Sequence, residues 1–217
     1  MGEPLGAGNG ESLADSGSLA ASSGEFFVKG VVTLIDGSNA YIQDATGAIC
    51  VRAASAISGI AVGDTIKATG TRETYRTLPQ LNKSTYEKVT DPAEQITLSA
   101  KATTIDSLTT SDVCKYVTIT DLTVQTAASS GNNVTVKDAN GNSIEIRKIV
   151  LSSDLNPGDV ITFTGAVGVF DSTRQLQNTN ADEIVVTSAA PVLPSSSFGL
   201  ASSIADGDEV ILYNAKK

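Results

Sequence analysis

Short runs in which apolar and polar residues alternate fill most of the chain, and turns rich in Gly, Asp, Asn and Ser separate them. The run at 26–35 is the longest, and further runs follow at 41–52 and 64–76. Alternation over four to eight residues is typical of a half-buried strand, and sequences such as DATG and DGSN are turn signals. The pattern therefore predicts an all-β protein.

The same pattern occurs twice, about 95 residues apart. YIQDATGAICVR at 41–52 matches TVKDANGNSIEIR at 135–147, and VGDTIKATG at 62–70 matches PGDVITFTG at 157–165. A third match pairs PQL at 79–81 with RQL at 174–176. The offset stays at 94–95 residues throughout, which shared turn sequences alone do not explain. We therefore predict two copies of one small domain.

These matches divide the chain into five parts. We expect a polar flexible lead at 1–24, repeat 1 at 25–98, a connector at 99–115, repeat 2 at 116–187, and a Pro/Ser linker with a terminal strand at 188–217. Each repeat reads as five strands with an insertion, either a loop or a short helix, between the third and the fourth. This order predicts two tandem five-stranded OB-fold (Greek-key) barrels.

Two finer expectations concern the end of the chain. In repeat 2 we expect the fifth strand to run from Gln175 to Val186. We also expect a strand at Asp206–Asn214, after the Pro/Ser linker. One strand alone cannot bury its apolar face or pair the backbone groups along its edges. The strand expected at Asp206–Asn214 therefore suggests that the chain is a fragment of a longer protein.

The motifs VKGVVT, YIQDATGAICVR, VGDTIKATGT and QL resemble the bacterial OB-fold domains found beside extracellular nucleases. They also resemble uncharacterised OB repeats of secreted and surface proteins from Bacteroidetes. The resemblance covers both repeats. It implies a module that binds nucleic acid or another polymer on the face of strands two and three, between the loops after strands one and four. It also implies a secreted or cell-surface location, although the first 24 residues lack the apolar core of a signal peptide.

The composition limits the chemistry that the chain can perform. It contains no histidine and only two cysteines, Cys50 and Cys114, so His-based catalytic triads and the usual zinc sites are excluded. Asp44 and Asp138 precede turn glycines and read as turn formers rather than calcium ligands. We therefore expect no enzymatic activity, no cofactor and no metal. Whether the two cysteines form a disulfide stays open.

The charge leaves the ligand open. The chain has a net charge of −9 and a pI of about 4.4, which disfavours nucleic acid, but its acidic excess is greater in repeat 2 than in repeat 1. One hypothesis is that repeat 1 binds single-stranded nucleic acid while repeat 2 braces it. The alternative is a secreted or cell-surface module that binds protein or glycan, or acts as a spacer. Aromatic and basic side chains near the expected face are the candidate ligand-binding residues: Tyr41, Arg52, Arg72, Tyr75, Arg76 and Lys83.

Overall fold

A computed structural model describes residues 25–191, and within them it contains twelve strands and three short 3₁₀ helices. This confirms the all-β prediction. The strand expected at Asp206–Asn214 and the N-terminal lead lie outside the described residues. The elements are β1 (Glu25–Asp36), β2 (Asn39–Gln43), β3 (Ala48–Ala53), β4 (Thr65–Tyr75), β5 (Leu78–Lys88), η1 (Pro92–Glu94), β6 (Lys101–Ala102), η2 (Thr110–Asp112), β7 (Tyr116–Val124), β8 (Val134–Lys137), β9 (Ser143–Ile146), β10 (Val160–Phe170), β11 (Thr173–Gln177), η3 (Ala181–Glu183) and β12 (Ile184–Ser188).

Strands β1 to β5 form the first barrel, called barrel 1 below. Their order around the barrel is β1-β2-β3-β5-β4, and β4 returns to pair with β1. Strands β3 and β5 are parallel, and the other neighbours are antiparallel. Inward residues of every strand, among them Val28, Ile42, Ile49 and Leu81, fill the interior. This strand order is that of an OB-fold, so the prediction for repeat 1 is confirmed.

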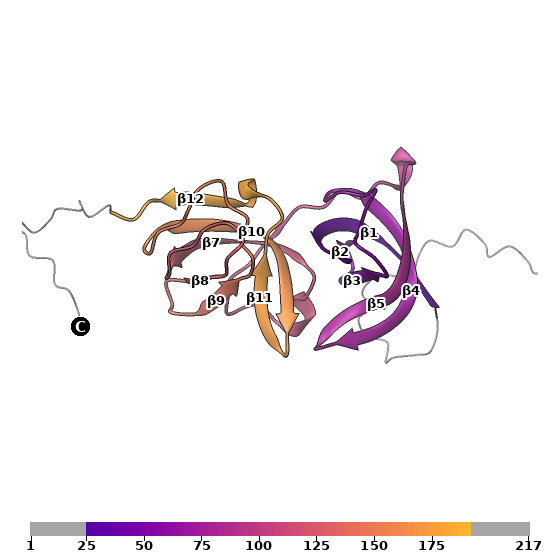
Figure 1. Cartoon of the computed structure of the whole chain (residues 1–217), viewed down its shortest axis with the longest axis horizontal. Coiled ribbons are helices and arrows are strands. Elements are labelled where there is room, and N and C mark those ends of the chain that lie inside the picture. Colours follow the sequence, from indigo (N-terminus) through magenta and orange to yellow (C-terminus); the bar gives the residue numbers. More distant parts are fainter. Residues whose placement is uncertain (1–24, 192–217) are drawn as a thin grey trace, which may run out of the picture.

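Barrel 2 has the same order. Strands β7, β8, β9, β11 and β10 are neighbours in that sequence, and β10 closes the ring by pairing with β7. Phe163 is the largest fully buried side chain of its core. The two barrels lie side by side along the long axis of the molecule (Figure 1). The prediction of two tandem OB-fold barrels is therefore confirmed.

The fifth strand of barrel 2 differs from the prediction. It is not continuous from Gln175 to Val186 but is split into β11 and β12 by η3. The cause is local, because the Glu183 carboxylate accepts hydrogen bonds from the backbone N–H groups of Thr179 (2.6 Å) and Asn180 (3.2 Å). Such bonds from a side chain compete with the strand ladder. Strand β12 then pairs with β10. It takes the place that the second half of β5 has in barrel 1, where it pairs with β4.

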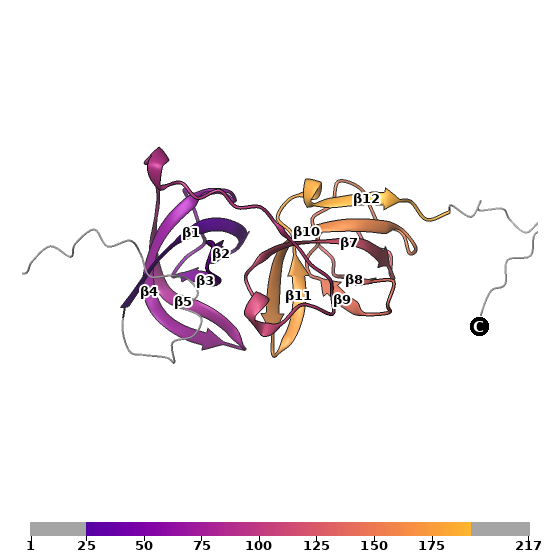
Figure 2. The same ribbon diagram turned by 180° about the vertical axis from the view of Figure 1, so that it is seen from behind.

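The structure shows which of the expected loops contain helices. The insertion between β3 and β4 is a loop without a helix, and the connector contains β6 and the single turn η2. Viewed from behind, the connector runs along the junction of the two barrels (Figure 2). Within residues 25–191, no helix is long and apolar enough to cross a membrane.

Gly70 and Gly165 are equivalent glycines, 95 residues apart, at the point where the fourth strand bends against the fifth. A Cβ on Gly70 would lie 2.9 Å from the carbonyl oxygen of Asn82, and one on Gly165 would overlap the carbonyl oxygen of Gln177 and the ring of Phe163. Only glycine allows the two backbones to approach this closely. The repeat therefore preserves a packing constraint.

We predict that Gly165→Ala destabilises barrel 2 by about 1–3 kcal/mol, the usual cost of overpacking a core. Ser143→Ala, at an exposed position of β9, is the matched control and should change stability by less than about 0.5 kcal/mol. Urea unfolding midpoints measure both. Equal midpoints for Gly165→Ala and the wild type would contradict this account of the bend.

Candidate functional site

Barrel 2 packs on the outer face of the sheet that β2 and β3 form in barrel 1. On β2, Ala40 and Ile42 point into barrel 1, whereas Tyr41 points outward and is still only 6% exposed. Tyr41 belongs to an apolar cluster that joins the two barrels. We call it the junction cluster; its members are Leu34, Tyr41, Cys50, Val113, Cys114 and Ala166. Part of the face that the OB-fold resemblance assigns to the ligand is thus covered by the chain itself.

Polar contacts fix the junction at its margins. The backbone N–H of Tyr116 donates to Gln43 Oε1 at 2.6 Å, and the Tyr41 hydroxyl donates to Gln177 Oε1 at 3.4 Å. Burial raises the pKa of Tyr41 well above its usual value, so the hydroxyl stays protonated and keeps this donor role.

The tips of the β4–β5 and β10–β11 hairpins meet on one side of the junction (Figure 1). Their turns share one conformation, since φ is 46° and 68° at Arg76 and Thr77 and again 46° and 68° at Asp171 and Ser172. Arg76 Nη1 lies 2.6 Å from Asp171 Oδ2, and the backbone N–H of Ser172 donates to Thr77 Oγ1 at 3.0 Å. We call this contact the hairpin clasp.

Two aromatic rings flank the hairpin clasp. Phe170 takes the place in repeat 2 that Tyr75 has in repeat 1, and the two side chains are 45% and 53% exposed. The Arg76 guanidinium lies over the Phe170 ring, with Cζ 4.7 Å from its centroid, and 6.0 Å from that of Tyr75. The Tyr75 hydroxyl and the Asp171 carboxylate raise the pKa of Arg76, so this cation is permanent.

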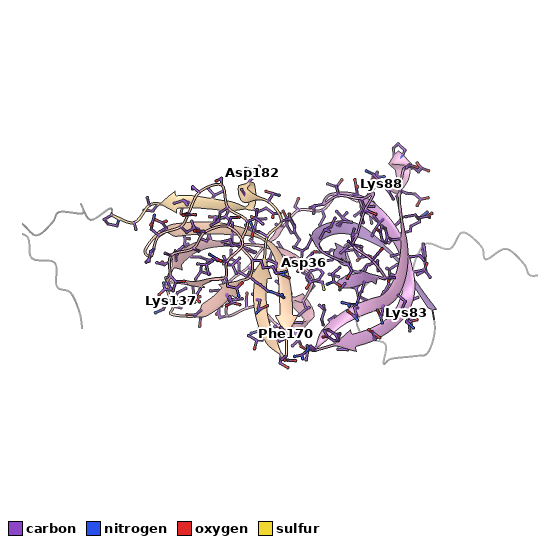
Figure 3. The ribbon with its side chains drawn as sticks, in the orientation of Figure 1. Asp36, Lys83, Lys88, Lys137, Phe170 and Asp182 are labelled. Atoms are coloured by element: carbon purple, nitrogen blue, oxygen red, sulfur yellow. The ribbon has the colours of Figure 1, made fainter. Side chains whose placement is uncertain are left out.

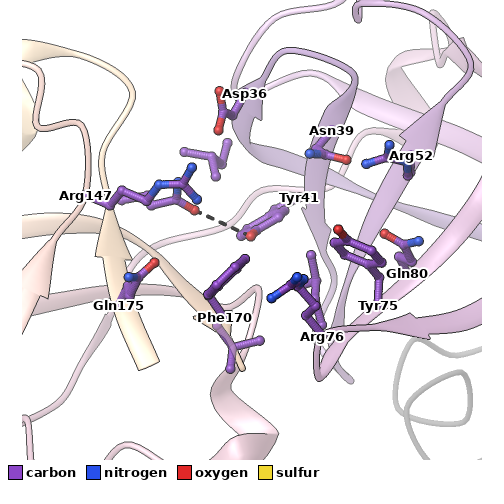
Figure 4. A pocket seen from close by; sticks show the side chains of 14 residues that line it. Asp36, Asn39, Tyr41, Arg52, Tyr75, Arg76, Gln80, Arg147, Phe170 and Gln175 are labelled. Carbon is purple, nitrogen blue, oxygen red and sulfur yellow. Dashed lines mark hydrogen bonds between the residues drawn. The ribbon is translucent and has the colours of Figure 1, made fainter. Parts of the chain in front are cut away.

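A pocket of about 210 Å³ lies between the junction cluster and the hairpin clasp. We call it the inter-barrel pocket. Figure 4 shows that its labelled side chains come from both barrels and face one another across the gap. Its lining consists of Leu34, Asp36, Asn39, Tyr41, Arg52, Tyr75, Arg76, Leu78, Gln80, Arg147, Val169, Phe170, Gln175 and Gln177.

The inter-barrel pocket is locally positive although the chain is acidic. Three arginines line it against one carboxylate, Asp36, and Asp36 already faces Lys148 at 3.4 Å. Arg52 is the next-to-last residue of β3, and Arg147 directly follows β9, the equivalent strand of repeat 2. In the part of the chain that the structure describes, neither has a carboxylate within ion-pair distance. The pocket therefore offers two cations to an anion from outside.

Two side-chain oxygens at the inter-barrel pocket also lack a partner among the described residues. They are Asn39 Oδ1 and Gln80 Oε1, both buried from solvent. Buried acceptors are rarely left without a hydrogen bond. Both atoms are shielded from solvent, so they lie in the wall of the pocket and are not open to its interior.

The structure brings together four of the six residues predicted from the sequence. Arg52, Tyr75 and Arg76 line the inter-barrel pocket as candidate contacts. Tyr41 also borders it, but its ring is buried in the junction cluster. The sequence could not reveal this, because it does not show that the outer face of β2 meets a second barrel.

Arg72 and Lys83 do not line the inter-barrel pocket. Arg72 lies opposite Leu81 in the ladder and so shares the core-facing side of the sheet, where burial lowers its pKa. Lys83 has a φ of 52° at a shift in the register of β5. It lies on the outer side of barrel 1, away from Phe170 (Figure 3).

The sequence reasoning missed Arg147, Gln80 and Asn39 and left Phe170 without a role. The constant offset was the available signal for two of them, because it matches Arg147 to Arg52 and Phe170 to Tyr75. No pattern in the sequence marks the two amides.

The aspartates before the turns act as predicted. Asp44 Oδ1 accepts from the backbone N–H groups of Thr46 (2.7 Å) and Gly47 (2.9 Å), and Asp138 Oδ1 accepts from those of Asn140 (3.0 Å) and Asn142 (2.8 Å). Their role as turn formers is confirmed.

No protein-family model matches the chain, and no curated protein matches it. Among solved structures, a replication protein A heterotrimer bound to ssDNA has a TM-score of 0.35 and 10% identity. That match covers 82% of this chain and 52% of the other, so this chain spans about half of its length. A murine DNA-binding protein bound with double-stranded DNA (TM-score 0.39, 17% identity, 76% and 96% covered) and fission yeast Pot1 with ssDNA (0.37, 12%, 88% and 92%) are also similar. TM-scores below 0.5 support no inference about this chain, so the OB-fold assignment rests on its own strand order.

Cys50 and Cys114 are both free and fully buried in the junction cluster, one from each side of the junction. Burial raises the pKa of Cys50 to about 12 and that of Cys114 well above its usual value. Both thiols are therefore protonated and shielded only while the barrels stay docked.

We predict that neither thiol of the native protein reacts with Ellman's reagent at pH 8, and that both react after unfolding in guanidinium chloride, because the thiolate is the reactive form. Tyr41→Ala removes the aromatic ring from the junction cluster and should make both thiols react without denaturant. Tyr86→Ala, which removes a half-buried ring on the far side of barrel 1, is the control. Rapid reaction of both thiols in the native wild type would show that the barrels do not stay docked.

Proposed function

We propose that this chain is a non-catalytic OB-fold binding module, and that its inter-barrel pocket holds a segment of single-stranded nucleic acid. One observation carries the proposal. Exposed Tyr75 and Phe170 stand beside Arg52 and Arg147, two cations without a carboxylate partner. Aromatic rings next to unpaired cations are what OB-folds use to stack bases and hold phosphates.

The size of the inter-barrel pocket favours a single strand. A space of about 210 Å³ between two barrels has room for an unstacked base but not for a double helix. Proteins that read single strands splay such bases out and stack them on aromatic or guanidinium planes. Tyr75 and the Arg76–Phe170 pair provide planes of both kinds.

The net charge of −9 works against this ligand at long range, so binding must depend on the local field of the inter-barrel pocket. Each phosphate neutralised on a single strand contributes a slope of about −0.7 to the plot of log affinity against log salt. If Arg52 and Arg147 each meet one phosphate, we expect a slope of about −1.4 from these two residues. Binding should therefore be detectable at low salt and should weaken as salt rises.

The site extends beyond the one expected on repeat 1. Arg147 and Phe170 belong to barrel 2, so in this proposal repeat 2 contributes ligand contacts as well as bracing.

The exposed edge of barrel 2 favours a second candidate function, which is the binding of a protein partner. There Val185 and Val186 of β12 are 51% and 42% exposed beside a shallow groove that Leu151 and Ile184 line. A secreted or cell-surface location stays a prediction that rests on the resemblance of the repeats.

We predict that Tyr75→Ala weakens binding to a labelled single-stranded oligo-dT by about 1–3 kcal/mol, the usual value for one stacked base. The double variant Arg52→Ala, Arg147→Ala should reduce the salt slope by about 1.4. Lys83→Ala removes an exposed cation outside the pocket and should change neither quantity. Fluorescence anisotropy from low to high salt measures all of them.

Absence of any binding by the wild type at low salt would reject the nucleic-acid proposal and favour the protein-binding candidate. Binding by the wild type that the double variant retains in full would place the ligand elsewhere on the molecule.

A further inference from the structure

Arg76 differs from the other two arginines that line the inter-barrel pocket, because a carboxylate of the protein itself neutralises it. Its Nη1 donates to Asp171 Oδ2 at 2.6 Å, and Asp171 comes from the tip of the β10–β11 hairpin of barrel 2. A guanidinium binds carboxylates and phosphates through the same kind of charge-assisted hydrogen bond. The Asp171 carboxylate therefore stands where the phosphate of a ligand would bind.

The surroundings of Arg76 match the parts of a nucleotide. Its Cζ lies 6.0 Å from the ring centroid of Tyr75 and 4.7 Å from that of Phe170, and both rings are about half exposed. Figure 4 shows the guanidinium between the two rings. In a single strand every phosphate is joined to a nucleoside with a base to stack, so a cation between exposed rings offers a partner to each part.

The ion pair of the hairpin clasp is open to exchange with a ligand. The side chains of Arg76 and Asp171 are 46% and 58% exposed, and exposed ion pairs contribute little to stability because water solvates both charges. Two further bonds hold the hairpin tips together without the ion pair. The backbone N–H of Asp171 donates to the carbonyl oxygen of Arg76 at 3.2 Å, and that of Ser172 donates to Thr77 Oγ1 at 3.0 Å.

We propose that Arg76 is a third phosphate-binding residue of the inter-barrel pocket, and that Asp171 occupies it in the free protein as a phosphate mimic. This inference rests on the proposed binding of single-stranded nucleic acid and adds a self-occupied subsite to it. The incoming phosphate replaces the carboxylate, so Arg76 keeps an anionic partner and stays between the two rings. Asp171 turns to solvent.

The salt dependence of binding reports this exchange. Arg76 and Asp171 together carry no net charge, so in the wild type the hairpin clasp contributes little to counterion release. Without the Asp171 charge, Arg76 acts as a further unpaired cation beside the strand. Each phosphate that such a cation neutralises on a single strand adds about −0.7 to the slope of log affinity against log salt.

The test measures the affinity of the full chain for labelled oligo-dT of on the order of eight nucleotides, the range of one OB-fold. Asp171→Asn removes the charge but keeps the shape, and Asn tolerates the φ of 46° at this position. We expect this variant to bind at least about threefold more tightly than the wild type at low salt, with a slope steeper by about 0.7. Its advantage should therefore grow about fivefold for each tenfold fall in salt.

Two controls separate the subsite from the general effect of removing a negative charge. Asp182→Asn makes the same change in net charge at an exposed position of barrel 2, away from Phe170 (Figure 3). Salt screens a charge at that distance, so this variant should change the affinity by less than about 1.5-fold. The double variant Arg76→Gln, Asp171→Asn has the net charge of the wild type and should lose both the gain in affinity and the additional slope.

The outcomes separate this inference from the proposed function. Binding that Asp171→Asn weakens or leaves unchanged would overturn the self-occupied subsite and leave single-strand binding intact, because the ion pair would then only position the rings. An equal gain for Asp171→Asn and Asp182→Asn would also overturn it, as would a gain that the double variant keeps. No binding by any of these proteins at low salt would reject the proposed function itself, and this inference with it.

Discussion

The burial of Tyr41 and Cys50 beneath barrel 2 is the contact on which the rest of the structure depends. These side chains point outward from barrel 1, and in an isolated barrel they would meet water. Docking against Cys114 and Ala166 removes their apolar surface from solvent, which is the main source of stability for such a contact. The same docking places the two hairpin tips together and sets Arg147 opposite Arg52. The inter-barrel pocket is therefore a product of the junction, and neither barrel has it alone.

The two repeats have diverged where they meet. Their hairpin turns have identical backbone conformations, but Arg76 in one corresponds to Asp171 in the other, so like positions form an ion pair at 2.6 Å. An exposed ion pair adds little stability by itself. Its value lies in orientation, because the contact fixes the aromatic rings of Tyr75 and Phe170 on either side of the inter-barrel pocket.

Much of the fold was predictable from the sequence, because the signals were local or periodic. The constant offset identified both barrels, and it also pairs Gly70 with Gly165. The split of the fifth strand of barrel 2 was not predicted, since it depends on Glu183 capping a turn. The burial of Tyr41 was not predictable either, because alternation distinguishes the two faces of a strand but not what the outer face meets. For the same reason the unpaired oxygens of Gln80 and Asn39 appear only once the packing is known.

Barrel 1 docks on barrel 2 through an apolar outer face, and the equivalent outer face of barrel 2 is different. Where barrel 1 pairs Tyr41 with Cys50 across two strands, barrel 2 pairs Thr135 with Glu145. A threonine beside a carboxylate provides no apolar surface on which another barrel could dock. Repeated domains that stack through one kind of face tend to extend into arrays unless the last unit carries a polar outer face. The equivalent face of barrel 2 is polar at this pair, so it is unsuited to the kind of docking that joins barrel 1 to barrel 2.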